Sequence, residues 1–149
     1  MQKISEEGLN LIKRFEGFSP IIYHDAAGLP TIGYGHLLLP GEEDIFQDAI
    51  SKIKAEQLLK KDVKKSENAV NSLVDISLTT GQFDALVSFT FNVGAGSFSN
   101  STLLKKVNKS EHEAVPGEFM RWIWAGGRKL TGLMRRRQAE IRVYRGELF

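Results

Sequence analysis

Apolar residues near the start of the chain recur at the spacing of one face of a helix. They are Ile4, Leu9, Leu11, Ile12 and Phe15. Ser5 is a suitable N-cap for this helix, because its hydroxyl can accept a hydrogen bond from an amide of the first turn. Gly17 is the expected stop, since glycine readily adopts the left-handed conformation that ends helices. The pattern therefore predicts a first helix that ends close to Glu16.

Glycine and proline interrupt this pattern between Gly17 and about Leu39, and the pieces between them favour strands. The strand-prone pieces are Ile21-Ile22-Tyr23 and Thr31-Ile32-Gly33-Tyr34. The stretch predicts a small antiparallel hairpin or three-stranded sheet, which Pro40-Gly41 closes.

Helical periodicity returns after about Asp44 and continues almost to the end of the chain. The predicted segments carry their apolar residues at 45–63, 69–74, 83–91, 103–107 and 133–144. The expected boundary residues are Thr79 or Thr80 and Gly94 for the third segment, and Ser99 or Asn100 for the start of the fourth.

Together these elements predict an α+β fold that is predominantly helical. We expect one domain over residues 1–149, in which residues 17–43 form a small antiparallel β-lobe. Residues 1–16 and 44–149 form a larger helical lobe that includes a connecting helix. A cleft between two such lobes is a natural ligand site.

Composition narrows the chemistry that this fold can carry. The chain has no cysteine, which excludes disulfides and thiolate metal sites. It has no run of eighteen apolar residues and no apolar segment of a secretory signal, so we expect neither a membrane anchor nor a signal peptide. Eight Lys and Arg stand against three acidic residues from Pro116 onward, although the net charge is only +2. This basic end indicates either an anionic partner or a solvated helix face.

Two carboxyl groups with unlike surroundings dominate the candidate chemistry. Glu16 stands between Phe15 and Phe18, which places it to keep a proton. Asp25 lies in a polar turn, which places it to stay ionised, and Thr31 adds a hydroxyl a few residues later. A neutral acid and an ionised partner are what the cleavage of a glycosidic bond needs.

Plainer interpretations of the same residues stay open. Glu16 would be an ordinary ion-pair partner of Arg14 or of an arginine in the last helix, and Asp25 would cap its own turn. His24, Asp25 and His36 suggest a metal site such as that of a zinc amidase. Their spacing matches no zinc pattern, so we expect no metal, an exposed His24 and a hydrogen-bonded His36.

Three stretches of the chain resemble the phage-type lysozymes, or endolysins, of glycoside hydrolase family 24. The first contains Phe15-Glu16-Gly17, Tyr23-x-Asp25 and Pro30-Thr31-Ile32-Gly33-Tyr34-Gly35-His36. Asp25 follows Glu16 by nine residues and Thr31 follows Asp25 by six, as in the family motif. The likeness continues through residues 85–94 and 98–102 and ends in 122–140, so it covers essentially the whole chain.

The resemblance implies a lysozyme-like fold and an endo-acting muramidase, which cleaves the β-1,4 bond between N-acetylmuramic acid and N-acetylglucosamine in peptidoglycan. It makes Glu16 the general acid. Asp25 and Thr31 would position the attacking water, or Asp25 would stabilise the oxocarbenium-like centre, and both inversion and retention stay open. The implied glycan contacts are Leu37, Phe91, Asn92, Asn100 and Ser101. Arg135 is the implied partner that positions the acid.

The same resemblance implies a role in host cell lysis by a bacteriophage or prophage, without a cofactor. We expect a monomer that is made in the host cytoplasm and acts on peptidoglycan in the periplasm or cell wall after a holin opens the inner membrane. The basic C-terminal helix is expected to meet the anionic envelope. No nucleic-acid motif accompanies Arg135-Arg136-Arg137, so we expect no nucleic-acid partner.

Two other function classes stay open. A lytic transglycosylase of similar fold would use one acid/base group, leave an anhydro-sugar end and have no need of the Asp25 and Thr31 pair. A membrane-active or nucleic-acid-binding helical protein would act through the basic end with Trp122 and Trp124, and its activity would survive the loss of Glu16.

Overall fold

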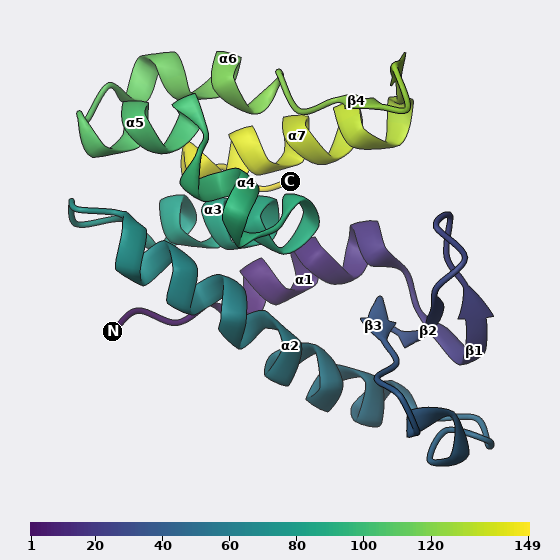
Figure 1. Cartoon of the computed structure of the whole chain (residues 1–149). Helices are drawn as coiled ribbons and strands as arrows, with labels where there is room; N and C mark the ends of the chain where they lie inside the picture. Colours follow the sequence, from purple (N-terminus) through teal and green to yellow (C-terminus); the bar gives the residue numbers. More distant parts are fainter. The chain divides into compact units, whose positions relative to one another are not determined.

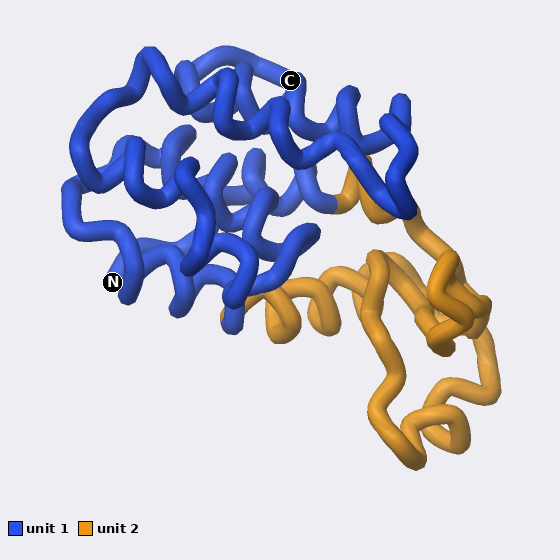
Figure 2. Tube along the Cα trace, turned by 45° about the horizontal axis from the view of Figure 1, so that its top comes forward, with its two compact units in different colours: residues 1–12, 65–149 blue, residues 13–64 orange.

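The computed structural model describes residues 1–149 and divides them into two compact units (Figure 2). One unit comprises residues 13–64, and the other comprises residues 1–12 and 65–149. The boundaries fall inside helices α1 (Glu6–Glu16) and α2 (Lys52–Leu73). Seven α-helices and two small antiparallel sheets confirm the predicted α+β class.

Helix α1 begins and ends where its sequence predicts. The Ser5 hydroxyl accepts a hydrogen bond from the Gly8 amide at 3.1 Å, which is the expected N-cap. The buried carboxylate of Asp84, on α3 (Thr80–Val93), accepts hydrogen bonds from the amide and the hydroxyl of Ser5, which fixes the start of the helix. Gly17, with φ +72°, donates its amide to the carbonyl of Lys13 at 2.9 Å and ends the helix.

The predicted sheet has three antiparallel strands, β1 (Ser19–His24), β2 (Pro30–Gly33) and β3 (His36–Leu37). Tyr23 of β1 lies opposite Thr31 of β2, and Thr31 lies opposite Leu37 of β3. The core of this unit consists of Ile32, Phe46 and Leu58, with Ile22, Leu38 and Ile50 packed against them.

The prediction of a helix from about Asp44 is wrong for the seven residues before α2. A short 3-10 helix, η1 (Glu42–Asp44), is followed by turns and irregular chain. Phe46 is buried against Ile32 of the sheet, and the Ile50 amide donates to the carbonyl of Pro20 at 2.9 Å. These contacts replace the hydrogen bonds of a helix, so the apolar residues here pack on the sheet in an irregular conformation.

Helix α2 joins the remainder of the segment predicted at 45–63 and the segment predicted at 69–74 into one element of 22 residues. The Ser51 hydroxyl accepts a hydrogen bond from the Lys54 amide at 3.1 Å and opens the helix. No glycine or proline lies between the two predicted segments, so nothing in the sequence ends the helix there. None of the helices in the structure combines the length and the apolar character that crossing a membrane requires.

The other unit is built from short helices around α3. They are α4 (Ala95–Ser99), α5 (Thr102–Asn108), η2 (His112–Ala114), α6 (Val115–Phe119) and α7 (Thr131–Tyr144), with a small hairpin of β4 (Trp124–Ala125) and β5 (Arg128–Lys129) (Figure 1). Thr79 and Gln82 form a capping box at the start of α3. The ring of Phe89 lies at the centre, 5.5 Å from Phe119 and 5.4 Å from Trp122. Trp122 is thus an aromatic anchor of this core.

Candidate active site

Glu16 is the last residue of α1 and leads directly into the loop before β1 (Figure 1). Its side chain is half-buried and lines a cavity of about 250 Å³ with Gly17, Phe18, Ser19 and Tyr23. The Glu16 carboxyl group is therefore accessible to a ligand in this cavity.

Gly35 supplies a wall for the Glu16 carboxyl group that the sequence alone did not single out. A methyl group at Gly35 would lie 2.6 Å from Glu16 Oε1 and 3.3 Å from the carboxyl carbon. Gly35 also has φ +75°, a conformation that glycine adopts without steric cost. The backbone therefore approaches the carboxyl group more closely than any other residue type permits.

Asp25 lies at the turn between β1 and β2, where its backbone amide donates to the carbonyl of Leu29. One oxygen of its side chain is hydrogen-bonded within this turn. Oδ1 accepts hydrogen bonds from the amides of Ala27 and Leu29, both at 2.9 Å, whereas Oδ2 has no hydrogen bond from the protein. Asp25 thus caps its own turn with one oxygen and leaves the other oxygen available to a ligand.

Thr31 is connected to Asp25 through one residue. The Thr31 hydroxyl donates to the carbonyl of Leu29 at 2.9 Å, and the Leu29 amide donates to Asp25. Thr31 is only 2% exposed, so its side chain has a single well-defined position in the strand. The hairpin therefore holds the carboxylate and the hydroxyl by its own backbone.

Tyr23 is the second residue that sequence reasoning did not assign to the site. Burial raises the pKa of its phenol, and the carboxyl groups of Glu16 and Asp25 raise it further when they are ionised. The phenol therefore stays protonated, and it lies close enough to both carboxyl groups to interact with them electrostatically. The signal in the sequence is the Tyr-x-Asp spacing, which places Tyr23 near the end of β1 and Asp25 directly after the strand.

A buried ionic cluster joins α7 to α3 in the other unit. Glu140 and Arg137, both 0% exposed, approach to 2.9 Å, and Glu140 also accepts a hydrogen bond from the Ser88 hydroxyl at 2.6 Å. Arg137 donates to the side-chain oxygen of Asn92 at 2.6 Å. Arg135 differs from its two buried neighbours in sequence, because its side chain is exposed. Its pairing with Glu16 stays a prediction.

The other implied glycan contacts lie on both units. Leu37 is 49% exposed on β3, whereas Phe91 is half-buried on α3. Asn100 and Ser101 line a cavity of about 270 Å³ together with Trp122. The Ser101 hydroxyl donates to the carbonyl of Phe98 at 2.7 Å and accepts from the Leu104 amide at 3.0 Å, so it caps α5 one residue later than predicted.

The histidines take the positions that the sequence predicts. His24 is exposed at the end of β1. His36 is buried between two carboxylates, with Nδ1 2.7 Å from Asp62 and Nε2 3.2 Å from Glu42. Both ring nitrogens of His36 are thus engaged in holding the sheet against η1 and α2.

Comparison with known proteins gives one consistent result. The family model described as phage lysozyme matches residues 13–140. The endolysin of Acyrthosiphon pisum secondary endosymbiont phage 1 is 40% identical over 145 residues, which are 95% of this chain and 97% of that protein. The endolysin of Bacillus phage B103 is 41% identical over 143 residues, but the chain spans only 53% of its length. The crystal structure of a mutant P22 lysozyme superimposes with a TM-score of 0.86 at 35% identity and covers 97% of this chain and 99% of that one.

Proposed function

The chain belongs to the phage lysozyme family of glycoside hydrolases, and on this premise we propose that it is an endo-acting muramidase. It cleaves the β-1,4 bond between N-acetylmuramic acid and N-acetylglucosamine in peptidoglycan and serves host cell lysis by a phage or prophage. The unlike surroundings of Glu16 and Asp25 carry this proposal.

Glu16 is the general acid in this mechanism. It lines a cavity at the C-terminal end of α1, where a ligand can reach its carboxyl group. Its proton passes to the leaving glycosidic oxygen as the bond breaks. Asp25 is the carboxylate partner, and two backbone amides that donate to Oδ1 hold it in place. The two carboxyl groups thus take different roles, because one lines a cavity and the other caps a turn.

Asp25 and Thr31 bind the attacking water. The Thr31 hydroxyl already donates its proton to Leu29, so it can only accept a hydrogen bond from a water. Oδ2 of Asp25 is also an acceptor without a protein donor. A water that donates both protons to these two oxygens directs a lone pair outward, which is the orientation that attack on the anomeric carbon needs. Asp25 then removes a proton as the water adds.

Further contacts follow from the family relationship. We propose that the glycan contacts Leu37, Phe91, Asn92, Asn100 and Ser101, and that Arg135 positions the acid. The hydrogen bond from Arg137 to Asn92 supports a glycan contact for Asn92, because it fixes the side-chain amide oxygen and leaves the amide NH₂ free to donate to a sugar. The enzyme acts on the cell wall after release by a holin, and its basic C-terminal helix meets the anionic envelope.

The products of purified peptidoglycan test the proposal. We expect mass spectrometry to show muropeptides with reducing N-acetylmuramic acid ends, and proton NMR of the fresh product to report inversion or retention. Anhydro-muropeptides would identify a lytic transglycosylase instead. Intact glycan after digestion by the wild type would refute the assignment of a glycosidase.

A methyl group at Gly35 is expected to disable the acid without unfolding the chain. Gly35→Ala pushes the Glu16 carboxyl group away, and a misplacement of about 1 Å costs on the order of a hundredfold in rate. The measurement is kcat/KM on peptidoglycan beside the free energy of unfolding.

Gly41→Ala is the matched control for this substitution. Gly41 has φ +89°, in the left-handed region like Gly35, but nothing lies within 4 Å of an added methyl group, and it lies outside the turn that holds Asp25. Both variants lose about 1–2 kcal/mol of stability from the left-handed backbone, and only Gly35→Ala loses activity. Equal activity losses in the two variants would show that backbone strain, and not contact with Glu16, accounts for the effect.

A further inference from the structure

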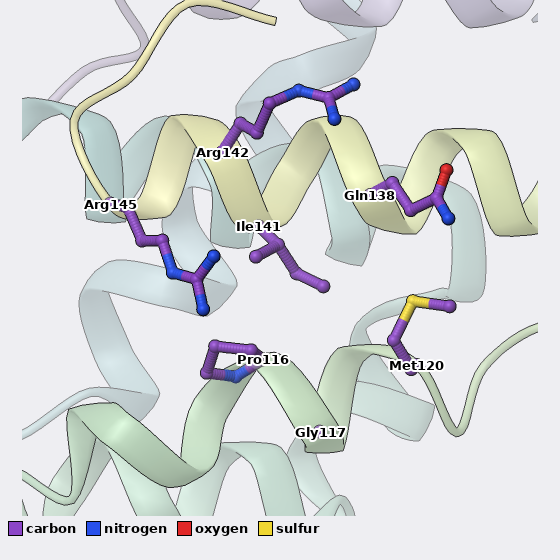
Figure 3. Close-up of a pocket in the computed structure, with 7 residues that line it drawn as sticks. All are labelled: Pro116, Gly117, Met120, Gln138, Ile141, Arg142 and Arg145. Atoms are coloured by element: carbon purple, nitrogen blue, oxygen red, sulfur yellow. The ribbon is translucent and has the colours of Figure 1, made fainter.

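A cavity between α6 and α7 lies outside the residues that the proposed mechanism uses. It has a volume of about 510 Å³, within the range of sites for small molecules. The lining residues at α6 are Pro116, Gly117 and, directly after the helix, Met120 (Figure 3). Those at α7 are Gln138, Ile141, Arg142 and, directly after the helix, Arg145. In Figure 3, Ile141 and Met120 point toward each other between the helices, and Arg145 extends to Pro116.

The charge of this cavity is one-sided. Arg142 and Arg145 are exposed, and neither pairs with an acidic side chain. The acidic residues of the two helices are engaged elsewhere, since Glu118 pairs with Arg121 at 3.1 Å and Glu140 is fully buried in its ionic cluster. No carboxylate lines the cavity. The Arg145 guanidinium beside an apolar floor suits an anion that carries small apolar groups.

A membrane surface fits this cavity less well than a peptide does. A helix that lies on a bilayer needs large exposed apolar side chains on its lipid face. The exposed large apolar side chains of this protein include none from α6 or α7. The apolar groups here are instead recessed between the helices, and Gln138 supplies an amide that matches a peptide bond at one end.

We infer that this cavity, which we call the α6–α7 groove, binds a short peptide through its C-terminal carboxylate. The carboxylate pairs with Arg145, small side chains lie on Ile141 and Met120, and Gln138 bonds the peptide backbone. Arg142 points away from α6 in Figure 3 and adds positive charge at the rim of the groove. On the proposed function, which this inference builds on, the ligand is the stem peptide of peptidoglycan. The groove is then a second binding site for the substrate, separate from the residues that act on the glycan.

Binding tests the groove without reference to catalysis. The probe is N,N′-diacetyl-L-Lys-D-Ala-D-Ala, titrated into the full-length ¹⁵N-labelled protein, with shifts expected at Gly117, Met120 and Gln138. The C-terminal amide of the same peptide is the matched ligand, and we expect it to bind about tenfold more weakly because the charge-assisted hydrogen bonds are lost. No shifts with the free acid, or equal affinity for both peptides, would overturn the inference.

Two variants separate the groove from general charge. Arg145→Gln should weaken binding of the free acid about tenfold, whereas Arg128→Gln, at an exposed arginine on β5 outside the groove, should leave it unchanged. Gly117→Leu should block the groove, because nothing lies within 4 Å of a side chain added at Gly117. Equal effects of Arg145→Gln and Arg128→Gln would overturn the inference.

Hydrolysis distinguishes failure of the groove from failure of the proposed function. Arg145→Gln should lower kcat/KM on peptide-bearing peptidoglycan and leave it unchanged on glycan stripped of peptides. An equal loss on both substrates would refute a peptide site, whereas no hydrolysis of either by the wild type would refute the muramidase and leave the peptide titration to decide the groove. Sedimentation with phosphatidylglycerol vesicles that depends on Arg145, without peptide binding, would assign the groove to lipid and contradict the inference.

Discussion

Glu16→Gln is expected to lower the rate of peptidoglycan cleavage by about a thousandfold or more, within the range that general acid catalysis contributes. The amide has nearly the shape of the carboxyl group and fits beside Gly35, but it has no acidic proton to give to the leaving oxygen. Because only the proton is lost, the free energy of unfolding should change little. The measurement is the initial rate of muropeptide release beside a denaturant melt.

Glu56→Gln is the control for this substitution. Glu56 is a half-buried glutamate of the same unit, and its carboxylate pairs with Lys13 of α1. The same chemical change there should leave the cleavage rate within about twofold, since Glu56 does not line the cavity beside Glu16 and ion pairs that water still reaches contribute little. Retained cleavage by Glu16→Gln would remove Glu16 from the role of acid and turn attention to the basic end of the chain.

Glu140→Gln is expected to destabilise the protein by about 3–5 kcal/mol, the cost of leaving a buried charge without its partner. Arg137 is 0% exposed and its guanidinium lies over the ring of Phe89, so water cannot replace the lost carboxylate. The ionic cluster also joins α7 to α3, which makes the loss global to this unit. Urea denaturation followed by circular dichroism measures the change.

A second ion pair shows how far burial controls this effect. Glu118 and Arg121 are also close, at 3.1 Å, but the arginine side chain is 66% exposed. Glu118→Gln should therefore cost less than about 1 kcal/mol. Similar losses in the two variants would mean that the cluster around Glu140 gains nothing from its burial, contrary to the expectation.

Local signals in the sequence predicted the elements that bear the chemistry. The Ser5 cap and Gly17 stop defined α1, and the glycine and proline spacing predicted the small sheet. Both signals act over a few residues, so the chain itself specifies them. The same spacing brought Asp25 and Thr31 into one hairpin, where they share Leu29.

Contacts between distant residues accounted for what the sequence did not predict. The periodicity around Phe46 indicated a helix, yet burial against Ile32 of the sheet favours irregular chain there. The contact of Gly35 with Glu16 joins residues nineteen positions apart, and no local pattern reports such an approach. Periodicity describes which residues are apolar, whereas these contacts depend on which surface each residue meets.

The turn that holds Asp25 uses only the main chain of its neighbours. Ala27 and Leu29 give their amides to the carboxylate, and their side chains are exposed. The side chains of Ala27 and Leu29 are therefore free to differ while the carboxylate keeps its position. Ala26, also exposed and next to Asp25, is consequently a suitable place for a single cysteine in this cysteine-free chain. A fluorophore attached there would report arrival of the glycan from beside the reacting groups.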